Sequence, residues 1–378
     1  MILGVPRETA EGEKRVGLVP ESIPKLKGVE VHVQSGAGEG AEVTDSDYQN
    51  AGATIEKDAK SLFAVSDLIA KVQPFTPEEA DWLKQGSSVI SFLYPVAHLD
   101  TVRRLVDREA TAFAMELMPR ISRAQSMDAL SSQSLVSGYK AALIGAESLP
   151  KLFPLLMTAA GTIAPAKVFV LGAGVAGLEA IATARRLGAV VEAYDVRPVV
   201  KEQIESLGAK FVQLPLEATD AQTSGGYAKA QSEDFYKKQQ ELLASHAAQS
   251  DVVVTTALVP GSKAPLLLTE DAVKRMRKGS VIVDLAAEQG GNCALTEPGK
   301  TVVKHGIVIH GPLNLPSSMA PQASQLYSRN LTTFVLPMLK EGILNPDPSD
   351  DIVKGTMVVQ QGKVLHEATR KALGGGQG

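Results

Sequence analysis

Short apolar runs alternate with longer amphipathic stretches along the first third of the chain. The runs have strand length and cover residues 2–5, 29–33, 67–72, 88–93 and 111–116. Stretches of helix length with one apolar face separate them. Strands that alternate with helices form parallel sheets, because each crossover helix returns the chain to the same end of the sheet. The pattern predicts a doubly wound α/β domain.

A second series of the same kind begins at Lys167. A helix is predicted over residues 135–149, where Pro150 ends it, and Pro165 precedes the next strand. The strands predicted in this series cover residues 167–171, 190–195, 210–214, 251–255, 280–284 and 307–310. Six strands match the count of a Rossmann-type dinucleotide fold. A second α/β domain therefore follows the first.

The last part of the chain predicts one more long helix, over residues 320–339, and then a short, loose tail rich in Gly and Pro. We expect this segment to return to the first domain. The predicted architecture is two Rossmann-like, doubly wound domains, one made of residues 1–134 and 318–378 and the other of residues 135–317. We expect a cleft between them, a common place for a ligand.

Composition narrows the class of protein. A chain of 378 residues is too long for one core, and 44% apolar with 21% charged residues is a globular composition. A net charge of -4 gives no footprint for nucleic acid. No secretory signal and no long apolar window are present, so we expect a cytoplasmic chain. With Cys293 alone and no clustered histidines, we expect no metal site.

A glycine motif follows the strand at residues 167–171. Gly172, Gly174 and Gly177 have GxGxxG spacing and lead directly into a helical pattern. In such a motif the first glycine allows a tight turn, the second lets a pyrophosphate approach the backbone, and the third packs the helix against the strand. The free N–H groups of the helix N-terminus favour phosphate. The motif predicts a dinucleotide site.

An acidic residue ends the next predicted strand. Asp195 lies eighteen residues after Gly177, where a carboxylate accepts hydrogen bonds from the adenosine ribose and repels a 2′-phosphate. This favours NAD(H) over NADP(H). Arg197 could serve a 2′-phosphate, but we expect it to lie over the adenine or in solvent. A second glycine loop, residues 36–40, leads into polar sequence and is interpreted as structural.

Two polar stretches fit around such a nucleotide. Residues 119–133 follow a predicted strand and are rich in neutral polar groups, which orient a nicotinamide but shuttle protons poorly. Alternatively, Asp128 and the serines of this stretch only cap the next helix. Residues 215–241 form a long polar stretch with Tyr227 beside glycines, which fits either a loop that closes over a nucleotide or a plain surface excursion.

Several of these motifs resemble those of a known family, the NAD(H)-binding component of proton-translocating transhydrogenases. The motifs are Arg120-Ile-Ser-Arg-Ala-Gln-Ser-Met-Asp128, Leu130-Ser-Ser-Gln-Ser134, Gly172-Ala-Gly-Val-Ala-Gly177, Asp195-Val-Arg197, Gly225-Gly-Tyr-Ala-Lys229 and Glu288-Gln-Gly-Gly-Asn-Cys293. The resemblance covers almost the whole chain. Its Arg-Ile-Ser-Arg-Ala-Gln run is far more specific than the glycine fingerprint.

The resemblance implies direct hydride transfer between NADH on this chain and NADP+ on a partner subunit, coupled to proton movement by membrane subunits. It assigns positions at the nicotinamide and its ribose to Arg120, Gln125, Asp128 and Ser131, with Gln125 reaching toward the partner's nucleotide. It assigns the remaining cofactor contacts to Val175 at the pyrophosphate, to Asp195, Val196 and Arg197 at the adenosine, and to Gly226, Tyr227, Gln239 and Leu258 in the closing loop and nearby. Hydride transfer between nicotinamides needs no side-chain acid or base.

The resemblance also implies a homodimer of two-domain subunits. Some members of the family continue into transmembrane helices, whereas this sequence stops at Gly378. We therefore expect the split form, in which this subunit is peripheral on the cytoplasmic side and is held there by its membrane-embedded and NADP(H)-binding partners.

Alanine dehydrogenase, a relative with the same predicted fold, is the main alternative. Arg15 and Lys71 match its substrate-carboxylate arginine and active-site lysine. Tyr94 stands where that enzyme carries its catalytic histidine, and Glu288 replaces an active-site aspartate; His98 could restore the site only through a shifted loop. Otherwise Arg15 and Lys71 are packing or salt-bridge residues.

A non-catalytic NAD sensor is the alternative from another class. Such a protein would bind the nucleotide and report redox state by closing its cleft, and the long polar stretch permits this. The polar residues that face the nicotinamide would then have no role. Hydride transfer to a nucleotide on a partner separates the hypotheses, since a sensor transfers none.

Overall fold

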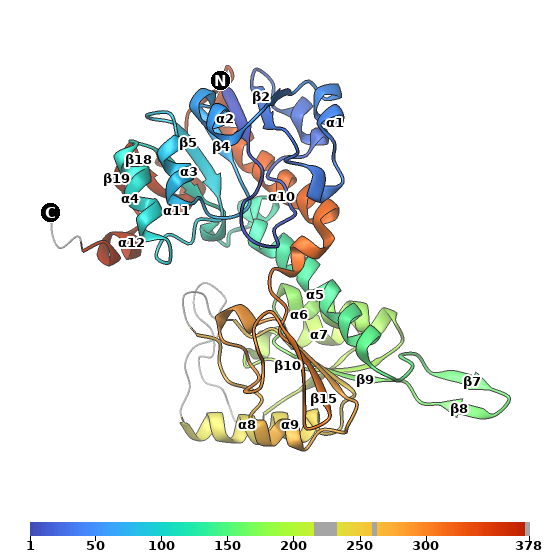
Figure 1. Ribbon diagram of the computed structural model, residues 1–378. Coiled ribbons are helices and arrows are strands. Elements are labelled where there is room, and N and C mark those ends of the chain that lie inside the picture. The colour runs from blue at the N-terminus through green and yellow to red at the C-terminus, as the bar shows by residue number, and fades with distance from the viewer. Residues whose placement is uncertain (215–232, 259–262, 375–378) are drawn as a thin grey trace. The chain divides into compact units, whose positions relative to one another are not determined.

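The computed structural model describes residues 1–214, 233–258 and 263–374. The chain divides into two compact units (Figure 1). The first unit consists of Met1–Gln133 and Pro316–Gly378, and the second is the continuous segment Ser134–Leu315. Each unit is built on one large, mainly parallel sheet with helices packed against it. The predicted fold class, two doubly wound α/β domains, is confirmed.

The first unit contains an eight-stranded sheet in the order β19-β18-β6-β5-β4-β1-β2-β3. Strands β1 to β6 are parallel, whereas β18 and β19 are antiparallel to their neighbours. The strands are β1 (Ile2–Val5), β2 (Glu30–Gln34), β3 (Thr54–Glu56), β4 (Leu68–Ala70), β5 (Ser88–Ser91), β6 (Thr111–Ala114), β18 (Met357–Gln360) and β19 (Lys363–Val364).

Helices cover both faces of this sheet, because side chains alternate along each strand. Leu68 and Ala70 of β4 join a core that includes Tyr327 and Phe334 of helix α10, whereas Ile69 joins a core on the other face. The helices on the first face are α1 (Asp45–Asn50), α10 (Ala320–Val335) and α11 (Asp351–Thr356). Those on the second are α2 (Ala59–Val65), α3 (Pro77–Trp82), α4 (Leu99–Asp107) and α12 (Glu367–Ala372).

The prediction of a loose tail after residue 339 is wrong. The segment forms the small hairpin β16 (Leu339–Lys340) and β17 (Ile343–Leu344), then α11, β18, β19 and α12. Strand β18 is largely buried and pairs with β6, so it extends the first sheet. Helix α10 ends at Val335 rather than 339, because Pro337 begins a tighter 3-10 turn there.

The second unit contains a seven-stranded sheet in the order β11-β10-β9-β12-β13-β15-β14. Its strands are β9 (Lys167–Leu171), β10 (Val190–Tyr194), β11 (Lys210–Val212), β12 (Val252–Thr255), β13 (Val281–Asp284), β14 (Thr301–Lys304) and β15 (Ile307–His310). Its helices are α6 (Val175–Arg186), α7 (Lys201–Ser206), α8 (Glu233–Ala247) and α9 (Glu270–Lys274). Helix α5 (Ala129–Ser148) begins in the first unit and continues into the second.

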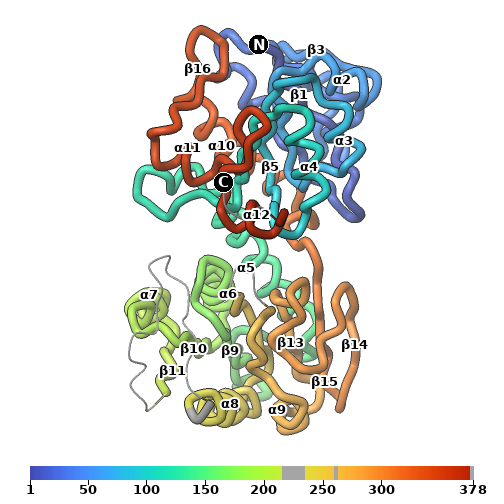
Figure 2. Tube along the Cα trace, turned by 90° about the vertical axis from the view of Figure 1, so that its left-hand side faces the viewer, coloured from blue at the N-terminus to red at the C-terminus, as the bar shows by residue number. Residues whose placement is uncertain are grey.

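The predicted six strands omit β14, which lies antiparallel to β15 at the sheet edge (Figure 2). Its exposed and half-buried residues alternate, and no continuous apolar run marks it. The predicted strands also omit a separate hairpin, β7 (Leu156–Thr158) and β8 (Gly161–Ile163), which extends from the second unit in Figure 1. Helix α5 begins six residues before the predicted position 135.

The strand order places a topological switch point at β9. The chain passes from β9 to β10 on one side, whereas β12 lies on the other side of β9. Crossovers in opposite directions leave a crevice at the carboxyl ends of the strands, where open α/β sheets bind ligands. The glycine motif follows β9 at this edge.

Candidate functional site

The first and third glycines of the motif are fixed by close packing within the second unit. Gly172 has φ +98, and a Cβ there would lie 2.6 Å from Thr256 Oγ1. A Cβ on Gly177 would lie 1.9 Å from the carbonyl oxygen of Gly172. Both positions therefore exclude a side chain, as the roles predicted for them require.

The middle glycine is different. Gly174 has extended backbone, and no described atom lies within 4 Å of a Cβ placed on it. The fold itself therefore does not require glycine here. Gly174 precedes α6, whose N-terminus has no side-chain cap, and the first helical residue, Val175, is 40% exposed. An open space at an uncapped helix N-terminus suits a phosphate group.

Asp195 follows β10 and is buried against the glycine loop. Its Oδ2 accepts a hydrogen bond from the backbone N–H of Ala173 at 2.8 Å. Arg197 donates from Nε to Oδ1 at 2.8 Å, from Nη2 to Oδ2 at 2.7 Å and from its backbone N–H to Oδ1 at 2.9 Å. Arg197 is thus paired with Asp195, and the expectation that it is solvated is wrong.

The other predicted cofactor residues of the second unit lie nearby in sequence or on neighbouring strands. Gln239 of α8 is buried, and its Nε2 donates to the hydroxyl oxygen of Tyr194 at 3.0 Å, beside Asp195. Burial raises the pKa of Tyr194 to about 12, so this hydroxyl stays protonated. Val196 is partly buried against the core, and Leu258, after β12, is 39% exposed. Gly226 and Tyr227 lie outside the described residues.

Sequence reasoning missed a buried polar brace at the same sheet edge. Asp284 ends β13, and its carboxylate accepts hydrogen bonds from the hydroxyls of Thr255 and Thr296, both at 2.7 Å, and from the backbone of Asn292 at 2.9 Å. The Asn292 side chain in turn donates to the carbonyl of Ala257 at 2.9 Å. The brace fixes the loop that carries Leu258. The position of Asp284 at a strand end was the signal available.

The predicted nicotinamide residues lie in the first unit, in the 3-10 helix Ser122–Met127 and at the start of α5. Arg120 and Gln125 are exposed. Asp128 accepts from the backbone N–H of Ser131 at 2.9 Å and from its hydroxyl. Asp128 therefore caps α5, as the alternative interpretation predicted, and it also fixes the orientation of Ser131.

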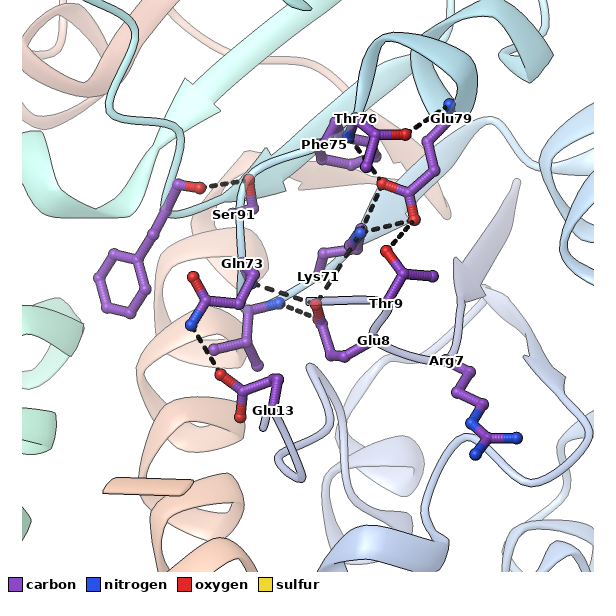
Figure 3. Close-up of polar contacts among 12 residues, drawn as sticks. Arg7, Glu8, Thr9, Glu13, Lys71, Gln73, Phe75, Thr76, Glu79 and Ser91 are labelled. Atoms are coloured by element: carbon purple, nitrogen blue, oxygen red, sulfur yellow. Dashed lines mark hydrogen bonds and ion pairs between the residues drawn. The ribbon is translucent and has the colours of Figure 1, made fainter. Parts of the chain in front are cut away.

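Arg15 and Lys71 belong to a buried ion-pair cluster at the carboxyl edge of the first sheet (Figure 3). Lys71 Nζ lies 2.7 and 2.6 Å from the two carboxylate oxygens of Glu79. Arg15 pairs with Glu13 through Nε at 2.8 Å and Nη2 at 2.6 Å. The interpretation of both cations as salt-bridge residues is confirmed. Burial, partly offset by Lys71, raises the pKa of Glu8 beside them to about 7.

Tyr94, at the expected histidine position, has φ +41 and is partly exposed. Its backbone N–H donates to Glu116 Oε1 at 2.5 Å, and that of Leu93 donates to Oε2 at 3.0 Å. Burial raises the pKa of Glu116 to about 7. Burial lowers the pKa of His98, which precedes α4. Glu116 thus holds the loop after β5.

Metal-binding clusters and membrane spans are both absent from the described part of the chain. Among residues 1–214, 233–258 and 263–374, no group of three or more His, Cys, Asp or Glu side chains is arranged to hold a metal ion. Within the same ranges, no helix has the length and apolar character needed to cross a membrane.

A glycine loop at a switch point, with a carboxylate after the next strand, defines an α/β nucleotide-binding domain. The chain matches the family described as alanine dehydrogenase/PNT, N-terminal domain, over residues 4–137, and the corresponding C-terminal domain over residues 141–367. The chain belongs to this alanine dehydrogenase/PNT family.

Within the family, the chain is more similar to transhydrogenase subunits than to alanine dehydrogenases. An NAD(P) transhydrogenase subunit alpha from Rhodospirillum rubrum is 49% identical over 97% of this chain and 98% of that protein. A solved transhydrogenase structure from Sinorhizobium meliloti, 43% identical, matches with a TM-score of 0.87 over 96% of this chain and all of that one. Alanine dehydrogenase 2 of Staphylococcus aureus is 30% identical over 99% of this chain and 96% of that protein. The resemblance inferred from the motifs is confirmed.

Proposed function

We propose that this chain is the NAD(H)-binding subunit of a proton-translocating NAD(P) transhydrogenase. The observation that carries the proposal is Gly174, a glycine that the fold does not need, beside an uncapped helix at the switch point. The relatives named transhydrogenase subunit alpha supply the reaction class. In this proposal hydride passes between NADH on this chain and NADP+ on a partner subunit.

Each residue of the site has a task in this proposal. Gly174 and Val175 admit the pyrophosphate, and Asp195, Val196 and Arg197 hold the adenosine. The carboxylate of Asp195 already accepts four hydrogen bonds from Ala173 and Arg197, which is about its full capacity. Arg197 must therefore release at least one bond before the ribose hydroxyls can bind, so it tunes NAD(H) affinity.

The remaining predicted contacts orient the reacting ring. Arg120, Gln125, Asp128 and Ser131 position the nicotinamide and its ribose. Bound NADH supplies the hydride. The chain's own contribution is proximity, orientation and exclusion of water, which together account for a large part of the barrier reduction in such transfers.

The partners follow from the same proposal. We propose a homodimer, supported by the hairpin of β7 and β8, whose apolar side chains Leu156, Met157 and Ile163 are exposed. A two-stranded hairpin is marginal in water by itself and is stabilised by packing against a second surface. NADP(H) binds a separate subunit, and membrane-embedded subunits move protons and hold this chain at the cytoplasmic face.

The test mixes the purified chain with an NADP(H)-binding transhydrogenase subunit and follows NADPH-dependent reduction of an NAD analogue with a distinct absorbance. Transfer only when both proteins are present supports the proposal. The control incubates the chain alone with NAD+ and alanine. Oxidation of alanine without transfer would favour the alanine dehydrogenase alternative, and nucleotide binding with neither reaction would favour a sensor.

A further inference from the structure

One buried side chain on helix α10 contacts both segments that carry the predicted nicotinamide residues. Asn330 is 8% exposed. Its Nδ2 donates to the carbonyl oxygen of Ser126 at 2.9 Å, next to Gln125. Its Oδ1 lies 2.7 Å from the hydroxyl of Ser132, next to Ser131. A single amide thus joins the 3-10 helix Ser122–Met127 to the first turn of α5.

The chemistry of the partners fixes the orientation of this amide. A carbonyl oxygen only accepts hydrogen bonds, so the group that faces Ser126 must be the NH2. The amide oxygen then faces Ser132, whose hydroxyl reaches it at 2.7 Å and reaches the carbonyl of Ala129 at 3.0 Å. Turning the amide over would place two acceptors together, so the tether holds one geometry.

The surroundings of Asn330 are apolar. Its helix neighbour Leu331 belongs to the same buried core as Ala124 and Met127 of the 3-10 helix. A buried amide with both ends engaged rigidifies its neighbours, because each lost hydrogen bond would leave a polar group unsatisfied at a cost of about 1–3 kcal/mol. Packing alone would hold these segments together, whereas the amide also fixes their register.

We propose that Asn330 is a positioning residue for hydride transfer. It holds Gln125, Asp128 and Ser131 in their relative positions without touching the nucleotide itself. This inference rests on the proposed function. A displacement of about 1 Å in a positioning group reduces transfer on the order of 100-fold, so the tether acts on turnover more than on binding.

A second tether of the same segment provides a contrast. Arg123 Nη1 pairs with Asp350 at 2.6 Å, but the Arg123 side chain is 57% exposed. Solvent-exposed pairs contribute about 0–1 kcal/mol. Loss of this pair should therefore change transfer far less than loss of the buried amide.

The experiment compares N330A, N330D and S132A in the full chain. N330A loses both contacts, N330D keeps the acceptor for Ser132 but loses the donor to Ser126, and S132A loses only the Ser132 contact. T333V is the matched control, because the Thr333 hydroxyl is on the same helix but exposed and bonded to Arg329. Turnover with the NADP(H)-binding subunit, NADH affinity by fluorescence, and amide hydrogen exchange without nucleotide are measured.

We expect N330A and N330D to lose about 10- to 100-fold in turnover, with NADH affinity unchanged, and S132A to lose less. Exchange across residues 122–132 should be faster in N330A and unchanged in T333V. Wild-type turnover and exchange in N330D and S132A would overturn the inference even if N330A fails to fold. If the wild-type chain transfers no hydride, the proposed function fails, and unchanged exchange in the variants then overturns the tether itself.

Discussion

At the scale of single residues, the three motif glycines have separable physical reasons. Gly172 and Gly177 are required by contacts within the chain, whereas Gly174 faces open space. Spacing alone could predict the motif and Asp195. It could not predict that Arg197 pairs with Asp195, because the rotamer of an arginine is set by its neighbours in space.

The glycine difference predicts opposite consequences for two similar substitutions. G177A should lower the free energy of unfolding by about 1–3 kcal/mol or more, because its Cβ meets a backbone carbonyl. G174A should change it by less than about 0.5 kcal/mol yet weaken NADH binding, because the methyl group occupies the phosphate's space. Denaturant unfolding and NADH titration measure the two effects. Equal loss of stability in both variants would contradict this account.

Glu8 predicts a pH dependence of stability. Its folded pKa of about 7 lies above the ordinary 4.5, so the folded chain keeps a proton that the unfolded chain releases, and stability is lost as pH rises from 4.5 to 7. E8Q cannot titrate. The stability of E8Q relative to wild type should therefore increase by about 2–4 kcal/mol between pH 5 and pH 8. Glu116 titrates similarly in both proteins and cancels. A constant difference across this range would show that Glu8 is ionised throughout.

At the scale of elements, the buried central strands and α6 could be predicted from apolar runs and glycine spacing. The short edge strands β3, β14, β18 and β19 could not, because two to four residues with polar neighbours carry little periodicity. The same limit applies to Asn330, whose partner Ser126 is 204 positions away. Contacts over such separations are created by the fold and leave no local pattern.

Helix α11 predicts unequal effects for the two partners of an exposed ion pair. Asp350 also caps α11, since its Oδ1 accepts from the backbone N–H of Ile352 at 2.8 Å. D350A should therefore destabilise by about 1 kcal/mol, and R123A by less than about 0.5 kcal/mol. Thermal unfolding of the single and double variants measures both effects. An R123A loss as large as that of D350A would mean that the pair, and not the cap, is the stabilising interaction.

At the scale of the whole molecule, the hairpin of β7 and β8 predicts self-association. Met157 is 81% exposed, so M157E should leave folding intact but weaken the proposed dimer by placing a charge in an apolar contact. V303E, at a 67% exposed residue on β14, is the matched control and should not change the oligomeric state. Sedimentation velocity distinguishes dimer from monomer. A wild-type monomer would contradict the homodimer proposal.

The central claim is that hydride passes directly from one nicotinamide to another. The most direct measurement follows an isotopic label from the transferable 4-position of NADH, with the chain, an NADP(H)-binding transhydrogenase subunit and NADP+. The account predicts that the label appears in NADPH and not in water, because no side-chain acid or base takes part. Label released to solvent, or NADPH formed without label, would contradict direct transfer.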